Sequence, residues 1–280
     1  MHGLFVSAIF TTLFVFVNGD FSGAFQNHLK SKYGAGTHEA LTRSDIGGGG
    51  SFGGGSNGNV KHKPVIVVHG ITNSAGHFAR IQQFFKSHGY SDNEIYGTTY
   101  GDAGKTNVLF VTMSCHYMKV IRMMIITVNE YTNSKVNVMG YSMGSPVARK
   151  AILGGRCVDT GEELGGSLTN RVDTFVGVAG ANFGSALCVF PFGSCNTNNG
   201  MHCTSSFLAD INARQRYEAT NKIFTIYSTN DDKVGYMSCG RKASAIIGEN
   251  GAFEKQGMNH DQLMFDTVAL QFNLVTFGHA

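Results

Sequence analysis

The sequence predicts an α/β fold in which a doubly wound, mostly parallel sheet carries helices on both faces. Apolar, strand-like segments alternate with helix-like segments along most of the chain, and this alternation is typical of consecutive β-α-β units. The first strand-like run, Val65–Val68, consists of four β-branched residues and is therefore expected to be buried on both faces, as in a parallel sheet. A glycine-framed serine between a strand-like and a helix-like segment, at 140–144, is the third indication.

Residues 1–19 have the pattern of a cleaved secretory signal. An apolar run from Leu4 to Val17 ends in Val17-Asn18-Gly19 and is shorter than the roughly 20 residues that span a bilayer. The alternative is a buried N-terminal helix. No later stretch is long and apolar enough to be a transmembrane segment, so we expect a secreted protein.

Residues 20–62 are expected to form an N-terminal extension. Its first part shows no clear period, and residues 47–59 are almost wholly Gly, Ser and Asn, a composition typical of a flexible linker. Phe52 is unusual in a linker, so the segment can instead lie against the folded domain, which is predicted to cover residues 63–280.

The first half of that domain reads as two further helices and one strand after Val65–Val68. Phe78, Ile81, Phe84 and Phe85 recur at helical spacing before Gly89, and residues 95–100 read as the next strand. An amphipathic helix then covers residues 113–131.

The segment that follows, residues 135–153, contains the candidate catalytic serine. Residues 135–139 alternate as a buried strand, residues 145–153 favour a helix, and Gly140-Tyr141-Ser142-Met143-Gly144 joins them. Strand, G-x-S-x-G and helix form the context of a nucleophile elbow. Side chains at positions 140 and 144 would collide with the neighbouring strand and helix, and the serine hydroxyl is expected to project above the sheet.

The second half continues the alternation. The expected elements are strands at 171–180 and 222–227, and helices at 206–217 and 262–274. In such a sheet the ligand site lies at the carboxyl ends of the strands.

The charge of the chain argues against nucleic-acid binding. The net charge of +3 is small for 280 residues, and no cluster of Lys and Arg with interleaved aromatic residues is present, so nucleic acid is not an expected partner. We also expect no metal or organic cofactor.

The six cysteines (Cys115, Cys157, Cys188, Cys195, Cys203 and Cys239) favour disulfides in an exported protein. Three of them lie in one polar loop, which we expect at least one bridge to pin; the sequence does not choose the pairing. Zinc is the competing interpretation, but only His202 and Cys203 form an adjacent ligand pair, and the C-x-x-C spacing of structural sites is missing.

A nucleophilic serine needs a base and a carboxylate that orients the base. In a strand-elbow-helix fold of this kind the chain order is Ser, then Asp or Glu, then His, so the base follows Ser142. Among His202, His260 and His279, we predict His260, which precedes the last helix. Asp231 and Asp232 both follow a strand, and both remain candidates for the acid, because a register shift of one residue would decide which carboxylate faces the histidine.

An oxyanion hole needs two N–H donors. We expect the amide of Met143, directly after the serine, and that of Ile71, in the turn after the first core strand. His69 is a less favoured second base, and a structural role in this turn is the stronger interpretation.

Five ordered motifs between Pro64 and Leu274 resemble the class 2 lipases, which are minimal α/β-hydrolase lipases, and most closely the lipase-related secreted proteins of nematodes. They are Val65–Ile71, the elbow, Val178–Asn182, Ser228–Val234 and Gly257–His260. The resemblance implies an α/β-hydrolase fold and assigns the catalytic acid to Asp231. The Cys-bearing segment 182–203 is longer than in the small bacterial enzymes, which implies a small disulfide-bearing insertion.

We therefore expect a secreted carboxylic-ester hydrolase, a lipase acting on triacylglycerol or other lipid esters, with substrate present at a lipid–water interface. The alternatives are a non-lipid esterase or an acyltransferase that uses the same triad, or an inactive secreted lipid-binding protein of the same fold.

Overall fold

The computed structural model describes residues 20–280; the expected signal segment lies outside the described residues. A seven-stranded sheet in the order β1-β3-β2-β4-β5-β6-β9 forms its centre. All neighbouring strands are parallel except β1, which runs antiparallel to β3. The mostly parallel sheet is thus confirmed. The strands are β1 (Ser51–Phe52), β2 (Val65–Val68), β3 (Ile95–Thr98), β4 (Val136–Tyr141), β5 (Val172–Val178), β6 (Lys222–Ser228) and β9 (Gly251–Lys255).

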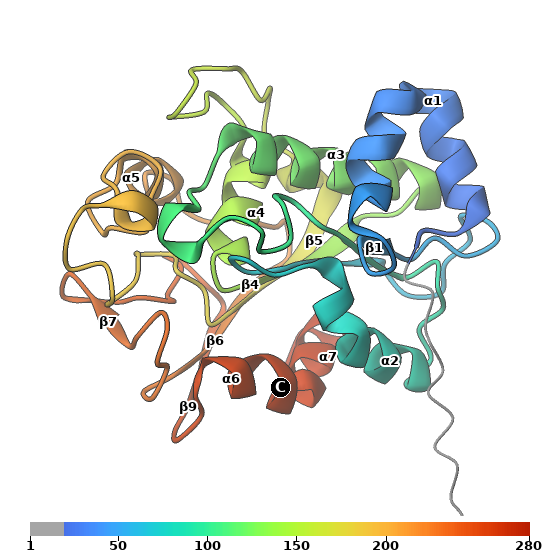
Figure 1. Ribbon diagram of the computed structural model, residues 1–280. Helices are drawn as coiled ribbons and strands as arrows, with labels where there is room; N and C mark the ends of the chain where they lie inside the picture. The colour runs from blue at the N-terminus through green and yellow to red at the C-terminus, as the bar shows by residue number, and fades with distance from the viewer. Residues whose placement is uncertain (1–19) are drawn as a thin grey trace, which may run out of the picture.

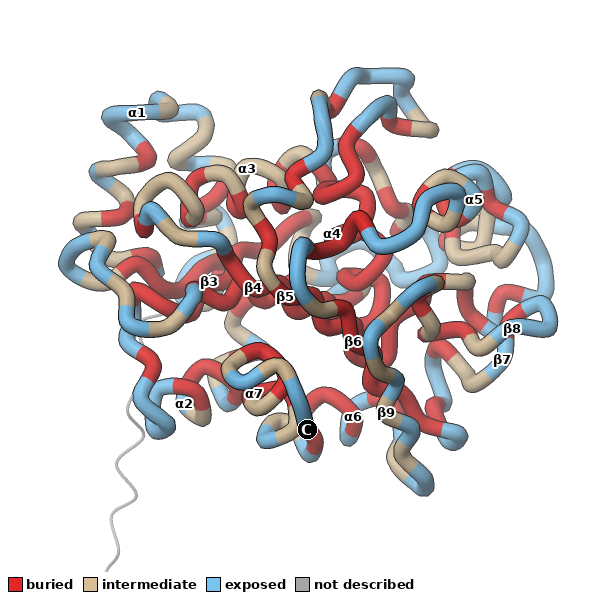
Figure 2. The backbone as a smooth tube through the Cα atoms, turned by 180° about the vertical axis from the view of Figure 1, so that it is seen from behind, coloured by how far each residue is buried: buried red, intermediate tan, exposed pale blue. Residues whose placement is uncertain are grey.

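Helices cover both faces of this sheet (Figure 1). On one face lie α1 (Gly23–Thr42), α3 (Cys115–Thr132), α4 (Gly144–Leu153) and α5 (Ser206–Asn212). On the other lie α2 (Ala79–Ser87), α6 (His260–Asp266) and α7 (Val268–Phe277). Each face therefore has its own apolar core. The strands β2, β3 and β4 between the two cores are fully buried, whereas β9 at one edge of the sheet has half-buried and exposed residues (Figure 2).

Burial on both faces explains the residue types of the central strands. Every residue of β2 and β4 is buried, as expected for strands that read as continuous apolar runs. The helix α4, which follows β4, is buried along its whole length, including Arg149 and Lys150. Those two charges are tolerated because each has an acidic partner: Arg149 Nε lies 2.9 Å from Glu218, and Lys150 Nζ lies 2.7 Å from Asp210.

The N-terminal region contributes structure that the sequence pattern does not predict. Residues 20–62 contain the helix α1, which is interrupted at Gly34 (φ 84°) and places Phe25 and Leu29 in the core. Phe52, within the glycine-rich segment, pairs with Gly97 of β3 and is buried. This segment therefore lies against the sheet.

The remaining elements are short. They are η1 (Ser44–Ile46), η2 (Ala75–Phe78), η3 (Val108–Phe110), η4 (Thr169–Arg171), η5 (Gly193–Cys195) and the hairpin of β7 (Met237–Ser238) and β8 (Arg241–Lys242). Two expected helices differ from the prediction: the one at 206–217 ends at Asn212, and the closing helix is divided into α6 and α7 at Thr267.

Three disulfides are present: Cys115–Cys157, Cys188–Cys195 and Cys203–Cys239. The second lies wholly within the polar loop, as expected, and the third connects that loop to the β7–β8 hairpin. Cys203, the zinc candidate, is thus bonded to another cysteine. Among residues 20–280, no helix is long and apolar enough to cross a membrane.

Candidate active site

Ser142 occupies a strained turn between the end of β4 and the start of α4. Its φ is 55°, a left-handed conformation that costs a residue with a Cβ about 1–3 kcal/mol. Flanking glycines make the turn possible. A Cβ on Gly144 would lie 2.1 Å from the carbonyl oxygen of His69, and one on Gly140 would lie 2.6 Å from the Cα of Ser145.

Backbone hydrogen bonds hold this serine in place. Its N–H donates to the carbonyl of Val178 at 2.9 Å, and its own carbonyl accepts from the N–H groups of Ser145 and Ala181. The turn is therefore anchored to α4, to the end of β5 and to the loop after β5, and these contacts offset the strain.

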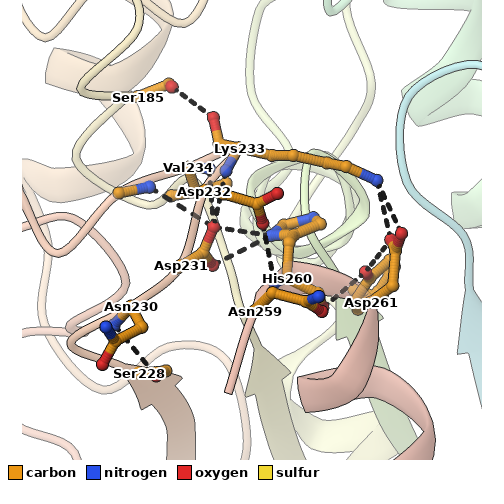
Figure 3. A network of polar contacts seen from close by, with 12 residues as sticks. Ser185, Ser228, Asn230, Asp231, Asp232, Lys233, Val234, Asn259, His260 and Asp261 are labelled. Atoms are coloured by element: carbon orange, nitrogen blue, oxygen red, sulfur yellow. Dashed lines mark hydrogen bonds and ion pairs between the residues drawn. The ribbon is translucent and has the colours of Figure 1, made fainter. Parts of the chain in front are cut away.

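Asp231 and His260 form a buried pair at the carboxyl edge of the sheet (Figure 3). Both carboxylate oxygens lie 2.9 Å from Nδ1 of His260. With Nδ1–H directed at the carboxylate, Nε2 is left as the acceptor nitrogen of the neutral ring. His260 is the first residue of α6, whose start is fixed by a capping box between Asn259 and Gln262.

The electrostatics of Asp231 favour its ionised form. Burial raises the pKa of the carboxyl, but hydrogen bonds from His260 and from the amides of Val234 and Lys233 outweigh it, so the pKa lies below its ordinary value. Because the pKa is lowered in the folded state, the pair stabilises the fold above the ordinary carboxyl pKa and loses this contribution as the pH falls through the folded value.

Asp232 has a different contact. Its Oδ1 accepts the backbone N–H of His260 at 3.0 Å, so it holds the main chain of that residue and not the imidazole. This hydrogen bond, more than any other interaction, lowers the pKa of its carboxyl. Of the two candidate acids, the structure brings Asp231 to the ring.

Tyr141, the residue directly before the serine, contacts His260. Its hydroxyl donates to the carbonyl of His260 at 2.9 Å, and the two ring centroids are 5.0 Å apart. Within the described residues no hydrogen bond joins Ser142 to His260; such bonds are often long in ligand-free sites and shorten when substrate binds.

The expected oxyanion donors are both unpaired. In the described part of the chain, neither the N–H of Ile71 nor that of Met143 donates to a protein acceptor. A Cβ on Gly70 would lie 2.9 Å from the Cβ of Ser142, so the turn that carries Ile71 approaches the serine closely. Two free amides beside a serine are the arrangement that an oxyanion hole requires.

Both ring nitrogens of His69 form hydrogen bonds with the backbone, one of them within the turn that carries Ile71. Nδ1 lies 2.7 Å from the carbonyl oxygen of Gly70, and Nε2 accepts the N–H of Tyr100 at 3.0 Å. Because C=O and N–H point in opposite directions across a trans peptide, holding the Gly70 carbonyl directs the Ile71 N–H away from His69. The ring is committed to structure, in agreement with the stronger of the two interpretations.

Burial lowers the pKa of His69 from 6.5 to about 4. Between pH 6.5 and about 4, the imidazole of His69 is protonated in the unfolded chain and neutral in the folded chain. The contribution of the buried His69 to the free energy of unfolding is therefore complete above pH 6.5 and is lost as the pH falls toward 4. We predict that His69→Asn, which retains a donor for Gly70, makes the free energy of unfolding less dependent on pH in this range by roughly 3 kcal/mol. Urea unfolding at several pH values measures it. His279→Asn, at an exposed histidine that does not act on His69, is the control, and an unchanged pH dependence in His69→Asn would contradict the assignment.

The other two candidate histidines take no part in this arrangement. His202 is half-buried in the polar loop, and His279 is exposed near the end of the chain. Sequence reasoning missed Tyr141 and Tyr100, which hydrogen-bond to the backbone of His260 and to His69. It also missed the ion pair between Lys233 and Asp261 (Figure 3). This pair joins α6 to the loop after β6 that carries Asp231, which we call the acid loop. The Asn259–Gln262 spacing was the one available signal that a helix begins at His260.

Comparison with known proteins bears on the fold that carries this site. A family model described as lipase (class 2) matches residues 62–273. Among solved structures, lipase B of Aspergillus fumigatus is similar, with 17% identity and a TM-score of 0.56 over 81% of this chain and 55% of that one. The mature lipase BlEst2 of Bacillus licheniformis is 14% identical, with a TM-score of 0.52 over 78% of this chain and 95% of that one. The chain thus spans about half the length of the fungal protein, and the structural likeness supports the α/β-hydrolase fold.

Proposed function

The chain belongs to the class 2 lipase family of serine ester hydrolases, and we propose that it is a secreted enzyme that cleaves lipid esters with Ser142, His260 and Asp231. The observation that carries this proposal is the buried Asp231–His260 pair beside the strained serine turn. A carboxylate that fixes the tautomer of an imidazole, next to a serine in a nucleophile elbow, is the arrangement that activates a hydroxyl group.

In the proposed reaction, Ser142 Oγ attacks the ester carbonyl carbon while Nε2 of His260 accepts the hydroxyl proton. The carbonyl oxygen becomes an oxyanion, which receives hydrogen bonds from the amides of Ile71 and Met143. The tetrahedral intermediate collapses, and His260 returns the proton to the departing alcohol. Water then attacks the acyl carbon while His260 accepts a proton from it. The second tetrahedral intermediate collapses by breaking the bond to Ser142 Oγ, His260 returns the proton to that oxygen, and the carboxylic acid leaves.

Secretion is part of the proposal. Three disulfides are compatible with an oxidising compartment, and the sequence before Asp20 has the pattern of a signal peptide.

We expect the purified mature protein to hydrolyse p-nitrophenyl butyrate and p-nitrophenyl palmitate and to react with an alkyl fluorophosphonate at Ser142. Mass spectrometry of the digested adduct locates the label. The preferred chain length separates a lipase from a short-chain esterase. A folded protein that neither hydrolyses an ester nor takes the label would contradict the proposal and favour a lipid-binding protein.

A further inference from the structure

Exposed large apolar side chains are concentrated in two loops. Seven of the nine that are found in residues 20–280 lie there: Val108, Leu109, Phe110, Leu187, Val189, Phe190 and Phe192. We call these seven residues the apolar patch. Single exposed apolar residues are ordinary, but a contiguous group on a monomer marks an interaction surface.

The two loops meet each other. The rings of Phe110 and Phe192 have centroids 6.1 Å apart in an edge-to-face arrangement, and a Cβ on Gly193 would lie 2.0 Å from the carbonyl oxygen of Leu109. A third contact, the hydrogen bond from the N–H of Met113 to the carbonyl of Asn199, joins the loops at their bases. The patch is therefore one surface built from two segments.

Topology places this surface at the active-site edge. One loop follows β3 and the other follows β5, and these strands flank β2 and β4 in the sheet. Because all four strands are parallel, both loops leave from the edge at which Ile71 and Ser142 lie. Close contacts agree with this placement. The first loop reaches the turn that carries Ile71, since a Cβ on Gly104 would lie 2.7 Å from the carbonyl oxygen of Thr72. The second loop reaches the acid loop, where the carbonyl of Lys233 accepts a hydrogen bond from Ser185 Oγ.

The Cys188–Cys195 disulfide closes the second loop around its exposed apolar residues. It closes the segment that contains Val189, Phe190 and Phe192, and Phe190 remains 78% exposed. The apolar residues are thus displayed to solvent although burial would be favourable.

The absence of charged side chains in both loops favours a lipid as the partner of the patch. Neither residues 107–112 nor residues 186–194 contain an Asp, Glu, Lys or Arg, so the patch offers no ionic complementarity to a protein or an anionic polymer. We propose that the apolar patch inserts into the surface of neutral lipid and holds the active site against it. This inference rests on the proposed function for its biological purpose, because an enzyme whose ester substrate is insoluble must reach it at a lipid–water interface.

Vesicle sedimentation tests the insertion without hydrolysis. The mature chain carrying Ser142→Ala is mixed with phosphatidylcholine vesicles at low and at high salt, alone or with Val189→Ser and Phe190→Ser. Because each large apolar side chain transferred from water contributes about tenfold to partitioning, we expect the double substitution to weaken binding about 100-fold. We expect salt to have little effect. The matched control, Met237→Ser with Phe277→Ser, replaces the two exposed apolar side chains outside the patch and should bind like its parent.

Kinetics on two forms of substrate separate this inference from the proposed function. With Ser142 intact, Val189→Ser and Phe190→Ser should leave hydrolysis of dissolved p-nitrophenyl butyrate within about twofold and reduce hydrolysis of an emulsified long-chain ester about tenfold or more. A wild type that cleaves neither ester refutes the proposed function, while vesicle binding still reports on the patch.

Three results would overturn the inference: no vesicle binding by the parent, equal weakening in the control, or a parent that is dimeric in sedimentation velocity and becomes monomeric when the patch is changed. The last would assign the patch to a contact between copies of this chain.

Discussion

Replacing Ser142 with alanine should abolish ester hydrolysis, with kcat lowered by about 10⁶-fold. The alanine lacks the oxygen that forms the acyl-enzyme, and His260 and Asp231 then have no hydroxyl to activate. Only substrate binding and the two free amides remain. The measurement is the initial rate of p-nitrophenyl butyrate hydrolysis by the wild type and the variant at equal concentrations, together with loss of fluorophosphonate labelling.

Two further variants separate chemistry from folding. Ser145→Ala, three residues along, removes a buried hydrogen bond to Asn182; it should cost about 1–3 kcal/mol of stability and retain hydrolysis. Ser142→Gly should be inactive yet up to about 1 kcal/mol more stable, because glycine adopts φ 55° without strain. Hydrolysis that survives in Ser142→Ala would assign the activity to another residue.

The sequence specified the parts of this fold that depend on short-range patterns. Val65–Val68 is continuously apolar because β2 is buried on both faces, and the glycines at 140 and 144 are required by contacts within a few residues of the serine. Chain order then restricted the base to histidines after Ser142. These inferences need only local sterics and one topological rule.

Other features depend on contacts that no local pattern records. The helix α1 has no marked apolar face in sequence, since its burial is confined to a few residues such as Leu29 and Phe25. The ring of Phe25 contacts Tyr96 of β3 and Tyr131 of α3. The strand β9 alternates intermediate with exposed residues, and it is fixed by pairing with β6. The pairing of Cys203 with Cys239 joins segments that only the folded sheet brings together.

The choice between two adjacent aspartates shows the same limit. Which carboxylate reaches His260 depends on the register of the loop after β6, and this loop is set by the amides of Lys233 and Val234 that hydrogen-bond to Asp231. Residue spacing gives the pair of candidates, and the three-dimensional contacts distinguish them.

Asp231→Asn should lower kcat by about 10⁴-fold, whereas Asp232→Asn should lower it less than about tenfold. An amide at position 231 no longer stabilises the imidazolium that forms when His260 accepts the serine proton, and its NH₂ group can favour the wrong ring tautomer. At position 232 the asparagine oxygen still accepts the backbone N–H of His260, so the main chain stays in place. Rates on p-nitrophenyl butyrate, with unfolding curves for both variants, make the comparison.

The two substitutions are chemically identical and lie one residue apart, so a general effect of lost charge would affect both variants alike. Asp232→Ala extends the test, because it removes the acceptor itself: it should destabilise the start of α6 by about 1–3 kcal/mol and lower kcat less than Asp231→Asn does. A larger loss of kcat in Asp232→Asn than in Asp231→Asn would mean that the loop after β6 shifts by one residue when substrate binds, and Asp232 would then take the role proposed for Asp231.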